Sequence, residues 1–351
     1  MVKHLKGLDT LRAVAALSVV WGHLEIQKNN NEIENLIDLG FHIPSGHIAV
    51  IFFFVISGFL ITYLLVKEQD RNQTISLKNF YMRRILRIWP LYYLVLILSF
   101  TLFRVHYSWE SIIYCFTIFP NVGHAFYAGW PTSPQIWSIG VEEQFYLFWP
   151  ILFKIIPKRK IPFVLILFFI SYSILPHVIG FINARTFKND EMGTIINRFF
   201  YGTKFNCMAI GALFGYLFAT GSKTLTYFNK DLIAFLSIVG VFGFWFTGFE
   251  LTHFTDEMYS ILFAIALYNI VVSTKINIDI GISRFIGKIS YGIYMYHWII
   301  ILLAFKYIPV FENKFLYNII IYSAVFGCTI ITSWISFNTV EKYFLNIKKK
   351  Y

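Results

Sequence analysis

The sequence predicts an all-α, polytopic membrane protein of about ten transmembrane helices, with both chain ends in the cytoplasm. Of the 351 residues, 57% are hydrophobic and only 14% are charged, whereas about a quarter of the residues of a typical soluble domain are charged. Apolar runs long enough to cross a bilayer recur along the whole chain. The basic residues gather in alternate connections between those runs. These three observations together predict the fold class.

Ten apolar stretches come close to the roughly 20 residues that a transmembrane helix needs. They cover residues 8–24, 48–66, 88–103, 136–156, 161–182, 200–219, 232–249, 258–273, 286–305 and 316–337. A further apolar stretch at 109–119 is too short to cross, so we expect a re-entrant or interfacial segment there. No linker or low-complexity tract interrupts this pattern, which predicts one membrane-embedded domain over residues 1–351.

The orientation follows from the distribution of Lys and Arg. With the N-terminus inside, 22 of the 30 basic residues, among them Lys3 and Lys275, fall on cytoplasmic connections, and 8 fall outside. Counting 109–119 as a span would send the basic segment 154–160 outward, which disfavours that assignment. The net charge of +11 arises from these connections and not from one basic face, so we expect membrane lipids as partners and no nucleic acid.

The first span, DTLRAVAALSVVWGH (9–23), carries two ionisable side chains on one face. The steps from Arg12 to His23 turn a helix by about 1100°, three turns plus roughly 20°, and separate the two residues by ~16 Å along its axis. Charged groups inside a span are costly and usually face a cavity. Asp9 can pair with Arg12 at i,i+3, which is the simpler role for both. That pair leaves His23 unexplained, although a lone histidine near a helix end is more often structural than catalytic.

The third span opens with YMRRILRIWPLYY (81–93), where Arg84 and Arg87 share one face at i,i+3. Their planar guanidinium groups suit phosphate groups, which predicts an anion site at the cytoplasmic end of this span. Ordinary anchoring at the membrane surface is an equal alternative for the pair and the simpler role for Arg83. Pro90 is expected to stiffen the start of the helix.

The fourth span opens with IWSIGVEEQFYLFW (136–149), which places two acids among aromatic residues. We expect Glu143 to face water and Glu142 to turn inward, because neighbouring helix positions point in different directions. A carboxylate at the depth of His23 would form a general-base pair with that histidine.

Two more motifs place polar side chains inside spans. FFFVISGFLI contains Ser57 and Gly58 at positions where small residues let helices approach closely. ISYGIYMYHW contains Tyr294 and His297 at i,i+3, although an aromatic, packed helix is the simpler interpretation. Side chains that could line a common cavity are Asp9, Ser57, Tyr294 and His297. The cysteines lack CxxC spacing and are interpreted as packing residues, with no metal site predicted: Cys115, Cys207 and Cys328.

Five motifs, in order, resemble those of the membrane-bound acyltransferase-3 family: LDTLRAVAALSVVWGH, FFFVISGFLI, MRRILRIWPLYY, WSIGVEEQFYLFW and SYGIYMYH. The resemblance extends from Leu8 to about Phe344. Members of this family have ten transmembrane helices and transfer acyl groups, usually acetyl, from coenzyme A donors to sugars of cell-envelope glycans. Some members modify peptidoglycan, glucans or small molecules instead.

The resemblance carries family roles onto particular positions of this chain. It implies that Arg12, Arg84 and Arg87 bind the phosphate end of acetyl-CoA or another acyl-CoA. It implies that His23 is the general base and that Glu142 orients or charge-stabilises its imidazole. No metal is required for this chemistry.

The departures from the family pattern are small and leave these charged positions intact. Gly140 stands where serine or alanine is common, and Val14 stands where glycine is often seen. Many relatives carry a fused outer hydrolase-like domain, whereas this chain ends at Tyr351. The resemblance therefore implies a stand-alone transferase.

The predicted function is that of an integral O-acyltransferase of the cytoplasmic (inner) membrane. The expected acceptor is a sugar hydroxyl of a cell-surface polysaccharide or a lipopolysaccharide O-antigen on the outer side, which could be lipid-linked. The alternatives are another acceptor, such as a small molecule or a peptidoglycan precursor, or a lipid-linked glycan transporter without transferase activity. A transporter is expected to show inverted repeats, and the sequence shows no internal repeat.

Overall fold

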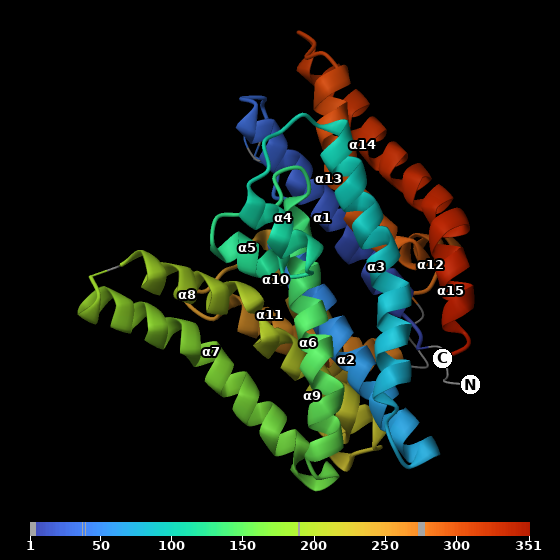
Figure 1. Ribbon diagram of the computed structural model, residues 1–351. Coiled ribbons are helices and arrows are strands. Elements are labelled where there is room, and N and C mark those ends of the chain that lie inside the picture. The colour runs from blue at the N-terminus through green and yellow to red at the C-terminus, as the bar shows by residue number, and fades with distance from the viewer. Residues whose placement is uncertain (1–4, 37, 39, 189, 273–277) are drawn as a thin grey trace.

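The computed structural model of the chain is helical throughout its regular structure (Figure 1). It describes residues 5–36, 38, 40–188, 190–272 and 278–351. No strand occurs among these residues, which confirms the predicted all-α class. Lys3 and Lys275, predicted to be cytoplasmic, and Ser273, predicted to end a span, lie outside the described residues.

Each of the ten predicted spans corresponds to a long helix. These helices are α1 (Leu8–Asn30), α2 (Gly46–Asn72), α3 (Leu77–Leu102), α6 (Trp137–Ile155), α7 (Ile161–Thr186), α9 (Phe205–Ala219), α10 (Asp231–Thr247), α11 (Thr255–Val272), α13 (Ser290–Tyr307) and α14 (Lys314–Ser336). Shorter helices lie between or after them: α4 (Trp109–Phe116), α5 (Pro120–Ala125), α8 (Glu191–Thr203), α12 (Gly281–Lys288) and α15 (Lys342–Lys348). The stretch at 109–119 therefore contains only the 8-residue α4, which is too short to cross, as predicted.

The helices differ in how well they meet the requirements of a membrane span. Within the described ranges, five helical stretches are long and apolar enough, namely those of α2, α3, α7, α11 and α14. The bent pair α12 and α13, whose axes differ by 70°, is a sixth if it forms one span. Helices α1 and α6 have the length of a span, 23 and 19 residues, but carry the charged side chains described below. The protein is thus polytopic, and ten crossings with cytoplasmic ends stay a prediction.

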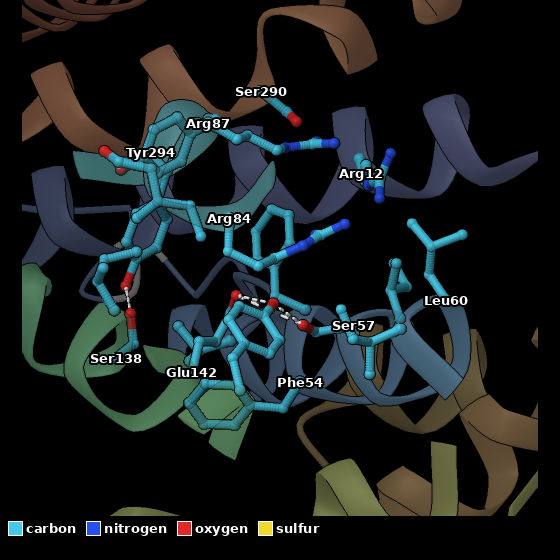
Figure 2. A pocket seen from close by; sticks show the side chains of 18 residues that line it. Arg12, Phe54, Ser57, Leu60, Arg84, Arg87, Ser138, Glu142, Ser290 and Tyr294 are labelled. Carbon is cyan, nitrogen blue, oxygen red and sulfur yellow. Dashed lines mark hydrogen bonds between the residues drawn. The ribbon is translucent and has the colours of Figure 1, made fainter. Parts of the chain in front are cut away.

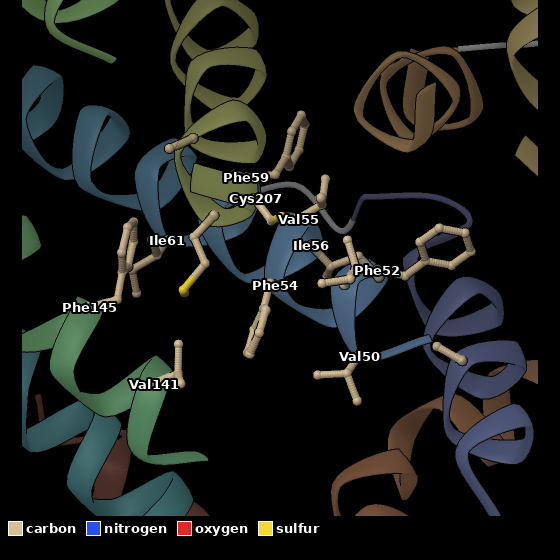
Figure 3. Close-up of a cluster of buried hydrophobic side chains, with 14 of the residues drawn as sticks. Val50, Phe52, Phe54, Val55, Ile56, Phe59, Ile61, Val141, Phe145 and Cys207 are labelled. Carbon is tan, nitrogen blue, oxygen red and sulfur yellow. The ribbon is translucent and has the colours of Figure 1, made fainter. Parts of the chain in front are cut away.

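Helix α2 runs through the centre of the bundle, and α7 and α8 lie side by side at its edge (Figure 1). Figure 3 shows the apolar side chains of α2 between α6 and α9. Phe52 of α2 stacks on Phe263 of α11 with ring centroids 3.9 Å apart. Phe54 and Phe59 of α2 and Phe145 of α6 are fully buried in the same cluster. The core therefore forms around α2.

Glycines bring α2 and α9 into backbone contact. A Cβ atom on Gly58 would collide with the Met208 carbonyl, and one on Gly211 would collide with the Val55 carbonyl. Small residues let helices in a membrane approach this closely. The prediction that Gly58 serves packing is therefore confirmed.

We expect Gly58→Ala to destabilise the protein by about 1–3 kcal/mol, because the added methyl group forces α2 away from α9. The measurement is thermal unfolding in detergent. The matched control is Gly327→Ala in α14, where an added Cβ has open space and alanine favours the helix by up to ~1 kcal/mol. Equal midpoints for the two variants would contradict this account of the α2–α9 contact.

The orientation can be tested by cysteine labelling in intact cells. Cys328 is exposed and is first replaced by serine, whereas Cys115 and Cys207 are buried. We expect new cysteines at the exposed positions Asn30 and His106 to react with an impermeant maleimide, and one at Asn72 to react only after permeabilisation. The reverse pattern would show that the basic-residue bias gives the wrong orientation.

Candidate active site

A cavity of about 110 Å³ lies between α1, α2, α3, α6 and α13 (Figure 2). Three guanidinium groups enter it, that of Arg12 from α1 and those of Arg84 and Arg87 from α3. Ser57 and Glu142 lie on the facing wall. We name it the arginine cavity, and its polar lining consists of Arg12, Ser57, Arg84, Arg87, Ser138, Glu142, Tyr146, Ser290, Tyr291 and Tyr294.

Helix α3 holds its two arginines on regular helical backbone. It begins at Leu77, well before the predicted start at residue 88, because Ser76 caps it by accepting a hydrogen bond from the Asn79 N–H. Pro90 consequently lies in the interior of the helix and not at its start, which corrects the prediction. Arg84 and Arg87 are therefore one helical turn apart inside α3, and both reach the cavity.

The positive charge of the arginine cavity is only partly neutralised. The Arg12 Nη1 atom is 3.9 Å from Asp9 Oδ1, so the predicted pair forms only at long range. Neither Arg84 nor Arg87 makes a salt bridge to a described residue, and the buried Nε of Arg84 has no hydrogen-bond partner among those residues. Lys348 of α15 is close enough to interact electrostatically with these arginines. Buried charges of one sign favour a bound anion, because an unpaired buried charge is costly.

Glu142 faces the arginine cavity and not His23. Its Oε2 accepts a hydrogen bond of 2.6 Å from the Tyr146 hydroxyl and a longer one of 3.4 Å from Ser57 Oγ. Ser57 Oγ and the Tyr146 hydroxyl also contact each other (Figure 2). Glu142 lies more than one turn into α6, which begins at Trp137, so it reaches the arginines. The expected pairing of Glu142 with His23 is therefore corrected.

Glu143 does not face water as predicted. Its Oε2 accepts a hydrogen bond of 2.8 Å from Trp89 Nε1 on α3, and its Oε1 is buried. Aromatic residues of α3 cover the position that was expected to be solvated, so this carboxylate joins α6 to α3.

His23 is hydrogen-bonded to a second histidine. The His23 Nδ1 and His297 Nε2 atoms are 2.8 Å apart, which joins α1 to α13. His297 is fully buried, whereas His23 is half-buried and has Trp298 edge-on at 5.0 Å between ring centroids. His23 is therefore partly accessible, and His297 is not.

The hydrogen bonds determine where the protons of the two neutral imidazoles lie. His297 Nδ1 is 2.7 Å from the carbonyl oxygen of Tyr294, and a carbonyl can only accept, so this nitrogen carries the proton. His297 Nε2 is then an acceptor, and the Nδ1–H of His23 donates to it. This leaves the His23 Nε2 atom unprotonated, as a general base requires.

Tyr294 connects the arginine cavity to the histidine pair. Its ring lines the cavity, its hydroxyl is 2.6 Å from Ser138 Oγ, and its ring centroid is 5.8 Å from that of His297. His297 lies one turn farther along α13, outside the cavity wall, and Asp9 also lies outside the wall beside Arg12. Of the four residues expected to line a cavity, Ser57 and Tyr294 do so.

The family model described as "Acyltransferase domain" matches residues 5–337, which is nearly the whole chain. The chain belongs to the acyltransferase-3 family. This agrees with the resemblance carried by the five sequence motifs, and members of the family are membrane proteins.

Several curated proteins resemble this chain. The peptidoglycan O-acetyltransferase OatA of Listeria monocytogenes is 28% identical over 97% of this chain and 55% of its own length. The O-acetyltransferase OatA of Staphylococcus aureus NCTC 8325 is 27% identical over 87% of this chain and 52% of its own length. A putative O-acetyltransferase of S. aureus COL is 25% identical over 98% of this chain and 58% of its own. The chain thus spans little more than half the length of these relatives. No solved structure matches.

The sequence analysis did not single out several residues in or beside the arginine cavity, among them Tyr146, Tyr291 and Lys348. Tyr146 follows Glu142 by four positions and therefore shares its helix face, a spacing that could have found it. Tyr291 lines the cavity and donates a hydrogen bond of 2.9 Å to the Ile88 carbonyl. Lys348 reaches the arginines only because α15 packs against α3, and no local pattern in the sequence indicates this contact.

Proposed function

We propose that this protein is a multi-pass O-acetyltransferase of the cytoplasmic membrane. It takes the acetyl group of acetyl-CoA at the cytoplasmic end of the arginine cavity and passes it to a sugar hydroxyl beside His23 of α1. The observation that carries this proposal is the hydrogen-bond chain from the Tyr294 carbonyl through His297 to His23, which starts at the wall of the arginine cavity. It places a base about three helical turns along α1 from Arg12.

The arginine cavity suits the anionic end of an acyl-CoA. Arg84 and Arg87 offer planar groups that bind phosphates in a bidentate manner, and Arg12 adds a third positive charge. The phosphate groups bind at the arginines, at the cytoplasmic end of the cavity, and the narrow pantetheine arm extends from there toward His23. The ~16 Å between Arg12 and His23 along α1 is then spanned by that arm.

His23 performs the proton transfers of the reaction. Its Nε2 takes the proton of the sugar hydroxyl while the hydroxyl oxygen forms a bond to the thioester carbon. The carbon–sulfur bond breaks, and the proton passes from His23 to the leaving sulfur. The products are an acetyl ester and a free thiol, and His23 is neutral again. His297 acts as a positioning residue that holds the His23 proton on Nδ1.

The acceptor proposed for this chain is a sugar of peptidoglycan. The name of the Listeria relative states that it acts on peptidoglycan, and that relative aligns with 97% of this chain. This favours peptidoglycan over the O-antigen or surface polysaccharide expected from the sequence. Mass spectrometry of cell-wall fragments with and without the gene tests the acceptor, because an acetyl group should be lost from the sugars.

We expect Arg84→Lys to weaken acetyl-CoA binding at least about tenfold, because a point charge replaces a planar fork that binds phosphate at two points. Binding is measured by competition with a labelled coenzyme A in detergent. The matched control is Arg83→Lys, since Arg83 instead pairs with Glu68 at 2.5 Å, outside the cavity lining. Equal affinity of Arg84→Lys and the wild type would assign the arginine pair to membrane anchoring.

We expect His23→Ala to lose about 100-fold or more in acetyl transfer while acetyl-CoA binding is kept, because a positioned base contributes about that much. His297→Phe should lose about tenfold, equivalent to one hydrogen bond of ~1.4 kcal/mol. His297→Gln should recover most of that loss, because its amide oxygen can accept the His23 Nδ1–H.

The exposed His106→Ala serves as the control for both histidines. A fully active His23→Ala would place the base elsewhere. Equal activity of His297→Gln and His297→Phe would contradict the positioning role of His297.

A further inference from the structure

A second cavity, of about 320 Å³, lies beside the start of α2 and is walled by α7, α8, α9 and the start of α11. We name it the lateral cavity and define it by His47, Lys204 and Asp256. Its lining is rich in polar side chains, which is unusual for space between membrane helices. None of these side chains takes part in the proposed transfer at His23.

Lys204 and Asp256 form a buried ion pair in the lateral cavity. Lys204 Nζ is 2.7 Å from Asp256 Oδ2, and both side chains are only 6% exposed. The other partner of Asp256 is His47, whose Nε2 is 3.0 Å from each carboxylate oxygen. His47 Nε2 therefore carries a proton, and when the ring is neutral its Nδ1 remains free to accept a hydrogen bond. Glu250 and Glu257 also line the cavity, so its lining carries more negative than positive charge, which disfavours an anion and suits an uncharged, polar ligand.

Hydrogen-bonding groups and aromatic faces occur together in this cavity. Asn206, 2% exposed, donates to Glu257 Oε1 at 2.6 Å and to Ser173 Oγ at 3.0 Å, while its Oδ1 has no partner among the described residues. Lys204 Nζ lies over one face of the Tyr201 ring, 3.7 Å from its centroid, and the Tyr201 side chain remains exposed. Sugar rings present hydroxyl groups at their edges and C–H groups on their faces, so a site for them combines these two kinds of lining.

The lateral cavity is close to the proposed base. Helices α1 and α2 touch at Gly22 and Gly46, where a Cβ on Gly22 would be 3.3 Å from the Gly46 Cα. His23 and His47 are the next residues in the two helices, so their Cα atoms are at most ~12 Å apart by standard backbone dimensions. A short oligosaccharide is long enough to reach from one side of this crossing to the other.

We propose that the lateral cavity binds a sugar unit of the acceptor glycan and holds the strand while a neighbouring sugar presents its hydroxyl to His23. This inference rests on the proposed function, because it assigns a place to the acceptor. His47 Nδ1 accepts a hydrogen bond from a hydroxyl of the sugar, and the exposed part of the Tyr201 ring packs on the ring face. The volume is at the lower end of the roughly 300–1,000 Å³ typical of ligand pockets, which suits one sugar ring and not a long strand.

The test measures binding of N,N′-diacetylchitobiose, an uncharged disaccharide of N-acetylglucosamine, to the purified protein by saturation-transfer NMR. We expect His47→Phe and Tyr201→Ala each to weaken binding at least about tenfold, equivalent to ~1.4 kcal/mol. His106→Phe, on an exposed loop, is the control and should bind like the wild type. Thermal unfolding identifies a variant that fails to fold, and the second variant then decides the outcome.

Activity separates this inference from the proposed function. With the disaccharide as acceptor, His47→Phe should raise its KM while hydrolysis of acetyl-CoA in water stays unchanged. Unchanged disaccharide affinity in both folded variants, or no binding by the wild type, would overturn the lateral site and leave the transfer at His23 standing. The wild type could bind the disaccharide but transfer no acetyl group to it. If both variants then bind the disaccharide more weakly, the lateral site is supported and the proposed function is refuted.

Discussion

The backbone contact between α2 and α9 is the constraint on which the rest of the structure depends. It requires glycine at Gly58 and Gly211, and it fixes the depth of α2 in the bundle. Ser57 then reaches the arginine cavity from the middle of α2, while His47 reaches the lateral cavity from its first turn. One helix thus positions a wall of both cavities, and any shift of α2 would change them together.

Glu142 and His23, which were expected to pair, lie in different electrostatic surroundings. Glu142 lies with the arginines, where opposite charges reduce the cost of burial. His23 is paired with His297, so the fully buried partner at this end is a neutral imidazole. A carboxylate in place of His297 would bring a buried charge that nothing beside it neutralises. The histidine pair directs the proton of His23 without that cost.

Local patterns in the sequence were enough to predict the long helices and the types of residue that line the arginine cavity. Apolar runs predicted each long helix, and the i,i+3 spacing of Arg84 and Arg87 placed both on one face. The partner of His23 was not predictable in the same way, because it depends on which helices are neighbours. His297 comes from α13 and Lys348 from α15, and neither contact has a local signal. Glu142 was assigned the wrong partner because helix depth, unlike helix face, cannot be read from spacing.

The bend between α12 and α13 has an electrostatic consequence. The break at Ile289 starts a new helix at Ser290, and Ser290 lines the arginine cavity (Figure 2). The first N–H groups of a helix lack partners within it, and they form the positive end of the helix dipole. A straight helix would have carried its own hydrogen bonds through this point. Because the last carbonyl groups of α12 end at the same bend, the break exposes backbone groups of both signs, and neither kind changes its partial charge with pH.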